Sequence, residues 1–376
     1  MATANSIITI DIQTAPALVF EGTLGKTALI TLTVPAGESS PATGYKKYEY
    51  TSNLAFSTAF TSSTELKQIG DDFFNNNFEG LASAVPDKIY VYLMPASPVA
   101  TDLQETADAI ASDGNITYVG FSSDVSVADS VSIGDRILTT NQAQKIVGFS
   151  SSTLTIADSA TLPVAYSTLE SNQQSFGALS SGVGLLWRNF GRYQMFNLEN
   201  SSFYPRDLTY SEPTLSTGVV LDDISDTQVS NISGFGFYSY TTYSGIPFVT
   251  PVHSFGGYTI YKTITEFYIR NGLQASTMNT IKINGGALDY TQDDFNLLEG
   301  SYQGYMESMF NAKMIAQGVY TEGTTTISLP HGYNIVFPAP TDITETDKQN
   351  HIINGIIIYV NFSGTVEKFE IVAKLQ

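Results

Sequence analysis

The sequence contains no cysteine and few charged side chains. The absence of cysteine excludes disulfide bonds and thiolate metal sites, and it leaves the redox compartment open. Charged residues make up 14% of the chain, and 36 acidic against 17 basic residues give a formal net charge of −19. Because a field of this sign repels phosphate backbones, we expect no nucleic-acid partner. A solvated acidic surface is the ordinary explanation of this charge, and an acidic surface that binds a basic partner is the alternative.

Long hydrophobic runs are also absent. The strongest run, 352–360, is broken by Asn354 and Gly355 and is too short to span a bilayer. The first residues have neither a basic region nor an unbroken apolar stretch, so we expect no signal peptide and no direct membrane insertion. We therefore expect the protein in the cytoplasm of the cell that makes it, unless it leaves inside a particle.

Motifs that would support catalysis or cofactor binding are missing. The segment 22–27 resembles a phosphate-binding loop, but too few residues separate its first glycine from the Gly25-Lys26 pair. The histidines are far apart and have no zinc-binding spacing: His253, His331 and His351. No nucleophile elbow of the Gly-x-Ser-x-Gly type occurs. We expect no catalytic residues, no metal site, no cofactor and no enzymatic activity.

Adjacent aspartates occur at 71–72, 222–223 and 293–294. Paired carboxylates can cleave glycosides, but neighbours in sequence point in different directions and do not form a catalytic pair. We expect the pair at 71–72 to face water. We attribute the pair at 293–294 to the favourable electrostatics of a helix start.

Aromatic side chains gather in the middle of the chain, where regular structure is hard to predict. They are Trp187, Phe190, Tyr193, Phe196, Phe203 and Tyr204, with Arg188, Arg192 and Arg206 nearby. We expect strands and long loops over 170–250. The ordinary role of such aromatics is to form a core, and the alternative is a contact surface between copies. For the arginines, packing or an inter-subunit salt bridge fits so acidic a chain better than binding of single-stranded nucleic acid.

At 376 residues the chain is long enough for two or three folding units. We expect an α+β fold with mixed sheets, two helices in the last third, strand-like extensions at both ends and an inserted small all-β unit. The expected divisions are a first part of the core with its terminal strand over 1–114, an inserted β-rich decoration over 115–168, and a second part of the core with its own terminal strand over 169–376.

Helical periodicity is strongest in the last third. The segment 258–273 carries an apolar stripe, and Gly272 stands near its expected end. Thr291 is expected to N-cap a helix over 291–317. The apolar stripe of this second helix recurs every three or four residues and consists of Phe295, Leu298, Tyr302, Tyr305 and Met309.

A weak internal repeat marks the segment 115–168. Gly120-Phe-Ser-Ser returns as Gly148-Phe-Ser-Ser. Short β-rich runs at 131–133, 136–139 and 153–156 lie between turns, so the pattern predicts paired hairpins in one small β unit.

The chain begins and ends on segments in which apolar and polar residues alternate, as in strands that have one covered face. The apolar positions are Ile8, Ile10 and Ile12 near the start, and Phe369, Ile371 and Leu375 near the end. Such strands must pair with something, either within the chain or in a neighbouring copy. These residues are our candidates for strand exchange between subunits.

Taken together, the order of these segments resembles that of contractile phage tail sheath proteins. The resemblance is one of pattern and is carried by 7–34, 48–52, 64–74, 88–93, 256–273, 281–284, 291–320, 355–360 and 366–375. The stretches 115–168 and 170–250 depart from the pattern.

The resemblance implies a structural subunit of a virion tail, assembled in the host cytoplasm. Sheath subunits form hexameric rings that stack helically around a tail tube, so the implied partners are other copies of the chain, the tail tube protein, and baseplate and tail terminator proteins. The terminal strands would add to sheets of neighbouring subunits. Contraction by rigid-body rotation of the subunits would then drive the tube into the host. The two helices of the last third would belong to the part nearest the tube.

Two other interpretations stay open. Another virion component, such as a tail tube, baseplate or capsid-surface protein, also fits the lack of catalytic motifs. A carbohydrate-binding or carbohydrate-cleaving protein is suggested by the tyrosines, the acidic residues and Trp187. The form of the assembly would test the first alternative, and glycan binding that is lost in Trp187→Ala would support the second.

Overall fold

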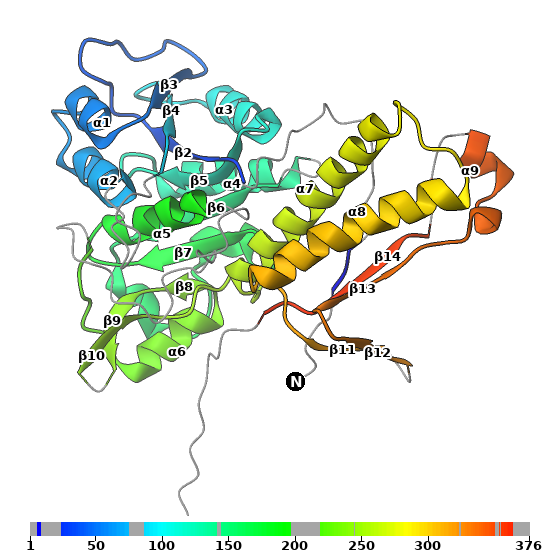
Figure 1. Ribbon diagram of the computed structural model, residues 1–376. Coiled ribbons are helices and arrows are strands. Elements are labelled where there is room, and N and C mark those ends of the chain that lie inside the picture. The colour runs from blue at the N-terminus through cyan, green and yellow to red at the C-terminus, as the bar shows by residue number, and fades with distance from the viewer. Residues whose placement is uncertain are drawn as a thin grey trace, which may run out of the picture. The chain divides into compact units, whose positions relative to one another are not determined.

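The computed structural model describes residues 6–8, 24–74, 86–140, 144–196, 219–243, 245–322, 325–349, 353 and 355–363 (Figure 1). These residues form two compact units. Unit 2 contains the described residues from Leu24 to Thr263, and unit 1 contains residues 6–8 together with the described residues from Ile264 onward. The boundaries expected at 114 and 168 both fall inside unit 2.

Unit 2 is built on a seven-stranded mixed sheet with the order β3-β4-β2-β5-β6-β7-β8. Its strands are β2 (Lys26–Thr31), β3 (Lys46–Tyr50), β4 (Ile89–Leu93), β5 (Ile116–Phe121), β6 (Ile146–Ser151), β7 (Ser175–Leu179) and β8 (Phe237–Tyr238). The edge strand β3 is antiparallel to β4, and every other neighbouring pair is parallel. The predicted α+β fold with a mixed sheet is confirmed.

Helices cover both faces of this sheet, because parallel strands need crossover connections. They are α1 (Asn53–Ala59), α2 (Thr64–Phe74), α3 (Ala100–Ser112), α4 (Val127–Thr139), α5 (Gly184–Met195) and α6 (Asp226–Gly234). Helices α2 and α5 pack together on one face, and α3 and α4 pack together on the other (Figure 1). Strands β4 and β5 are buried along their whole length, as expected for strands covered on both sides. A separate antiparallel pair consists of β9 (Tyr240–Tyr243) and β10 (Ile246–Val249).

The segment 115–168, expected to form a small all-β unit, is instead part of the seven-stranded sheet. It contributes β5, α4, β6 and two 3-10 helices, Leu154–Asp158 and Val164–Leu169. The runs 131–133 and 136–139 are not strands but belong to α4, which begins where the Ser126 hydroxyl accepts a hydrogen bond from the N–H of Asp129. The two Gly-Phe-Ser-Ser copies end the adjacent parallel strands β5 and β6. The repeat therefore marks successive strand–helix units rather than hairpins.

Of the central aromatic residues, Trp187, Phe190 and Tyr193 lie in helix α5 and form core, where strands and loops were expected, whereas Phe203 and Tyr204 lie outside the described residues. Trp187 is 1% exposed and Phe190 is fully buried. Two strand glycines face this helix. A methyl group at Gly120 would lie 2.7 Å from Cη2 of Trp187, and one at Gly148 would lie 2.7 Å from Cζ of Phe190. The glycines thus allow the bulky side chains of α5 to lie directly on the sheet.

Unit 1 contains two long helices and small antiparallel sheets. Its elements are β1 (Ser6–Ile8), most of α7 (Ile260–Ile283), α8 (Gln292–Asn311), β11 (Gly318–Glu322), β12 (Thr325–Leu329), β13 (Tyr333–Val336), the 3-10 helix Pro340–Asp342, α9 (Glu345–Gln349) and β14 (Ile357–Val360). Helix α8 begins as predicted, because the Thr291 hydroxyl accepts a hydrogen bond of 3.2 Å from the N–H of Asp294. Its predicted apolar stripe is buried at Phe295, Leu298, Tyr302 and Met309.

The sequence predicted that the first helix ends near Gly272, but α7 continues past this residue. Gly272 instead allows α8 to approach α7 closely. A methyl group at Gly272 would lie 1.8 Å from Cζ of Tyr305 on α8. The Tyr305 hydroxyl donates a hydrogen bond of 2.6 Å to the carbonyl of Tyr268, one turn earlier on α7. Because the ring of Tyr305 occupies the space of a side chain, α7 keeps a glycine there and continues to Ile283.

Candidate functional site

The strand nearest the N-terminus pairs with a strand from the far end of the described chain. Strand β1 is antiparallel to β14, with Ile8 opposite Ile358. Strand β14 also pairs with β13 on its other side, which gives the order β1-β14-β13. Ile358 and Val360 are fully buried, so the middle strand of this sheet is anchored in a core. We call these three strands the terminal sheet.

One of the predicted strand-exchange residues, Ile8, lies in the terminal sheet, where its strand pairs within the chain. The others lie outside the described residues: Ile10, Ile12, Phe369, Ile371 and Leu375. Strand exchange between copies therefore stays a prediction. A strand from a second copy that took the place of β1 would meet the same backbone groups of β14.

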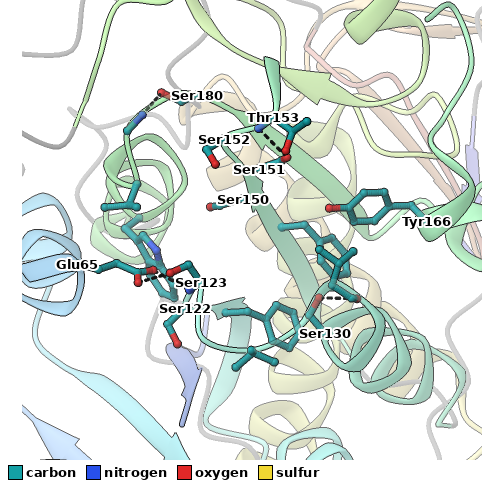
Figure 2. Close-up of a pocket in the computed structure, with 17 residues that line it drawn as sticks. Glu65, Ser122, Ser123, Ser130, Ser150, Ser151, Ser152, Thr153, Tyr166 and Ser180 are labelled. Carbon is teal, nitrogen blue, oxygen red and sulfur yellow. Dashed lines mark hydrogen bonds between the residues drawn. The ribbon is translucent and has the colours of Figure 1, made fainter. Parts of the chain in front are cut away.

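A pocket of about 220 Å³ lies at the carboxyl ends of β5, β6 and β7 in unit 2 (Figure 2). Its polar lining consists of Glu65, Ser122, Ser123, Ser130, Ser150, Ser151, Ser152, Thr153, Tyr166 and Ser180. Its apolar lining includes Phe121, Val125, Phe149 and Trp187. We call it the strand-end pocket. Helices from both faces contribute to it, and open α/β sheets bind ligands at this carboxyl edge.

Several hydroxyl groups of the pocket already have partners in the chain. Ser122 donates a hydrogen bond of 3.1 Å to the carbonyl of Ile30. The N–H of Ser123 donates to Glu65 at 2.6 Å, and the Ser123 hydroxyl donates to the other oxygen of the same carboxylate. These contacts tie α2 to the end of β5 and position the rim of the pocket.

Tyr166 differs from these hydroxyl residues. Its side chain points into the strand-end pocket and is 3% exposed (Figure 2). No described residue forms a hydrogen bond with its hydroxyl group. Burial raises the pKa of Tyr166 to about 12, so at neutral pH the phenol keeps its proton and can donate a hydrogen bond.

Asp124 fixes the strand ends beside the pocket. Its carboxylate accepts hydrogen bonds from the hydroxyls of Thr31 at 3.0 Å and Thr33 at 2.6 Å, from the N–H of Leu32 at 3.1 Å, and from the Ser122 hydroxyl. These donors occupy its acceptor sites. Asp124 therefore holds the ends of β2 and β5 together rather than reaching outward.

The pocket shows no catalytic constellation. Its lining contains one carboxylate, that of Glu65, and no histidine, lysine or arginine. A serine nucleophile needs an oriented base and a third group that holds the base, and the lining does not provide them. Among the described residues, no group of three His, Asp or Glu side chains could hold a metal ion. None of the described helices is long and apolar enough to cross a membrane.

The aspartate pair at 71–72 is not a solvent-facing pair, because the Asp72 side chain is fully buried. Its carboxylate lies 3.8 Å from the guanidinium of Arg188, which is also buried, and it accepts a hydrogen bond of 3.0 Å from Gln68. Burial raises the pKa of Asp72 to about 6, although Gln68 and Arg188 act in the opposite direction. The ion pair joins α2 to α5, in agreement with a packing role for Arg188.

The remaining candidates for chemistry have structural partners. Asp222 is buried, and its carboxylate accepts hydrogen bonds from the N–H and the hydroxyl of Ser181 at 3.0 and 2.6 Å. His331 is exposed, and its Nδ1 lies 2.8 Å from the carboxylate of Glu307. His351 and Arg206 lie outside the described residues. Apart from the repeated serines after Gly120 and Gly148, no sequence pattern indicated the strand-end pocket.

Comparisons with known proteins find likeness in fold but not in sequence. No family model matches the chain, and no curated protein matches it. A chain of the six-fold symmetrised cryo-EM structure of the anti-feeding prophage (AFP) baseplate superposes with a TM-score of 0.59 at 12% sequence identity. The match covers 100% of this chain and 99% of that one. At this identity the comparison shows a shared fold over the whole length.

Proposed function

We propose that the protein is a non-enzymatic structural subunit of a contractile-tail-like particle, in which copies assemble into rings. The single observation that carries the proposal is the whole-length fold likeness to a chain of the AFP baseplate structure. A shared fold alone does not imply a shared function. The proposal gains support from the pocket, whose lining offers no catalytic constellation, and from the terminal sheet, whose β1 belongs to one of the chain's terminal segments.

The position of the subunit within such a particle has two candidates. The sequence pattern resembles sheath proteins, whereas the structural neighbour comes from a baseplate. The neighbour therefore favours a baseplate component at least as strongly as a sheath subunit, and we place the protein in or next to a baseplate ring. Its partners there would be other copies of the chain and other tail proteins.

We propose that the terminal segments link the copies. Strand β14 offers backbone groups to β1 along one edge, and a β1 segment donated by a neighbour would satisfy the same groups. The apolar residues at positions 8, 10 and 12 would then cover the neighbour's core, while Thr9 and Asp11 would face away.

Electron microscopy of the purified full-length protein in negative stain, over a range of concentrations, tests the proposal. Six-fold rings or short stacks are expected for a baseplate component, and long tubes would instead favour the sheath. Deletion of residues 1–14 or 364–376 should leave a folded but non-assembling protein. Monomers at every concentration would contradict assembly with itself.

A matched pair of substitutions tests the strand-exchange part by itself. Ile10→Asp places a charge on the apolar face of the terminal segment and should abolish assembly, whereas Thr9→Asp places the same charge on the polar face and should not. Normal assembly of Ile10→Asp and of both deletions would refute strand exchange but leave ring formation by other surfaces intact. Fluorescence of the buried Trp187 reports in each case whether unit 2 is folded.

A further inference from the structure

We propose that the strand-end pocket binds a neutral, hydroxyl-bearing small molecule with one apolar face, of the size of a monosaccharide. This inference goes beyond the assembly function and does not depend on it. It rests on the shape of the pocket, on one hydroxyl donor that opens onto it and has no partner among the described residues, and on the distribution of charge around it.

The pocket has an aromatic floor and a hydroxyl rim. Phe121, Phe149 and Trp187 line its deeper part and are each at most 7% exposed. Ser150 lies near the end of β6, and Ser152 and Thr153 follow this strand (Figure 2). All three residues are exposed and form the mouth of the pocket. A sugar ring has the matching distribution, with C–H groups on one face and hydroxyl groups around its edge. The volume of about 220 Å³ is below that of pockets for drug-sized ligands but leaves room for one such ring.

Tyr166 is the observation that favours a bound ligand over an empty hollow. The ring of Tyr166 is buried, whereas its hydroxyl group opens onto the pocket, so it is a donor that a ligand can reach. The Tyr166 hydroxyl has no partner among the described residues, and it points into the pocket toward the side where Ser150 lies (Figure 2). The Ser150 and Ser152 hydroxyls also form no hydrogen bond with the described residues. A ligand hydroxyl between these groups could both accept from Tyr166 and donate to a serine oxygen.

The charge of the lining selects against anions. Its single charged side chain is the carboxylate of Glu65, and no cationic side chain lines the pocket. A phosphate or carboxylate ligand would be repelled and would find no counter-charge. A neutral polyol is not repelled by Glu65 and needs no counter-charge. Its hydroxyl groups can donate hydrogen bonds to Glu65 as well as to the serines.

Trp187 provides the measurement, because it lines the pocket and is the only tryptophan of the chain. The purified full-length protein is titrated with glucose, galactose, N-acetylglucosamine and myo-inositol, and with inorganic phosphate as the anionic comparison. We expect a saturable change in Trp187 fluorescence with at least one of the neutral compounds and none with phosphate. If no compound gives a saturable change, or if phosphate binds more tightly than every neutral compound, the proposal is overturned.

Variants separate binding in the pocket from binding elsewhere. Tyr166→Phe keeps the ring and removes only the unpartnered hydroxyl, so it should weaken the binding roughly 2- to 10-fold. Tyr45→Phe removes a hydroxyl from a partly exposed tyrosine that does not line the pocket, and it should leave binding unchanged. Ser150→Leu narrows the exposed mouth and should abolish binding without touching the core. Equal affinities in wild type, Tyr166→Phe and Ser150→Leu would refute the assignment to this pocket. A flat fluorescence titration with every compound would mean that only water occupies the pocket, which also overturns the proposal.

Discussion

Replacing Gly272 by alanine should destabilise unit 1, although the same change in most helices has the opposite effect. In an exposed helix interior, Gly→Ala stabilises by about 1 kcal/mol, because glycine loses more backbone entropy on folding. At Gly272, however, the new methyl group would lie 1.8 Å from Cζ and 2.2 Å from the hydroxyl oxygen of Tyr305. Neither atom can stay where it is, so the ring must leave its site.

The cost of this displacement follows from the contacts of Tyr305. Its hydrogen bond of 2.6 Å to the Tyr268 carbonyl would be lost, which costs about 1 kcal/mol net and more if the buried hydroxyl finds no new partner. Overpacking between the helices adds about 1–3 kcal/mol. After subtraction of the helix-propensity gain of about 1 kcal/mol, we expect Gly272→Ala to lower the free energy of unfolding by about 1–3 kcal/mol.

Gly300→Ala and Gly304→Ala are matched controls on α8, because a methyl group at either position meets no atom within 4 Å. Both should stabilise by up to about 1 kcal/mol. Urea unfolding followed by far-UV circular dichroism measures all three changes. In a double-mutant cycle, Tyr305→Ala should remove most of the cost of Gly272→Ala. If Gly272→Ala is as stable as the two controls, the close approach of α7 and α8 described above is wrong.

Two further predictions concern carboxylates of unit 2. Because burial raises the folded-state pKa of Asp72 from 3.8 to about 6, the folded state binds the proton more tightly, so ionisation should lower the free energy of unfolding by about 3 kcal/mol as the pH rises from about 3 to about 7. The stability of wild type relative to Asp72→Asn, measured by urea unfolding across this range, should therefore fall as the pH rises, and a constant difference would contradict the raised pKa. Asp124→Ala should cost about 2–4 kcal/mol, because it leaves the N–H of Leu32 without its acceptor and frees three hydroxyls. Asp223→Ala, at an exposed position, is the control and should change thermal unfolding little; equal losses in the two variants would argue against the Asp124 contacts.

Helices with one apolar stripe were predictable from the sequence, and helices with other patterns were not. The spacing from Phe295 to Met309 predicted α8, because one face of that helix is buried and the other is exposed. Helix α5 is buried nearly all round, so its sequence has no polar face to reveal a period. Helix α4 is rich in β-branched residues, which favoured strands, although Ser126 followed by Asp129 is a helix-start signal that could have identified it.

The repeat after Gly120 and Gly148 was visible in the sequence, but its meaning depended on tertiary structure. The spacing between the two copies is long enough for a strand, a helix and a loop back to the next strand. It therefore fits a strand–helix unit as well as two hairpins. What decides between them is the packing of both glycines against α5, which no local pattern contains. The strand-end pocket was missed for the same reason, because its lining comes from segments as far apart in sequence as Glu65 and Trp187. The ion pair of Asp72 likewise could not be predicted locally, because its partner Arg188 lies on a different helix.

The terminal sheet also sets an order of events during synthesis. Unit 2 is complete once the chain has grown to Thr263, so its core can form while the rest is still being made. Strand β1 precedes the whole of unit 2 in the sequence, yet its partner β14 follows only with Ile357–Val360. Until then β1 lacks the partner with which it pairs in the described part of the chain. The pairing of β1 with β14 therefore comes after the residues of unit 2 have been made, so the terminal sheet forms later than the core of unit 2 can.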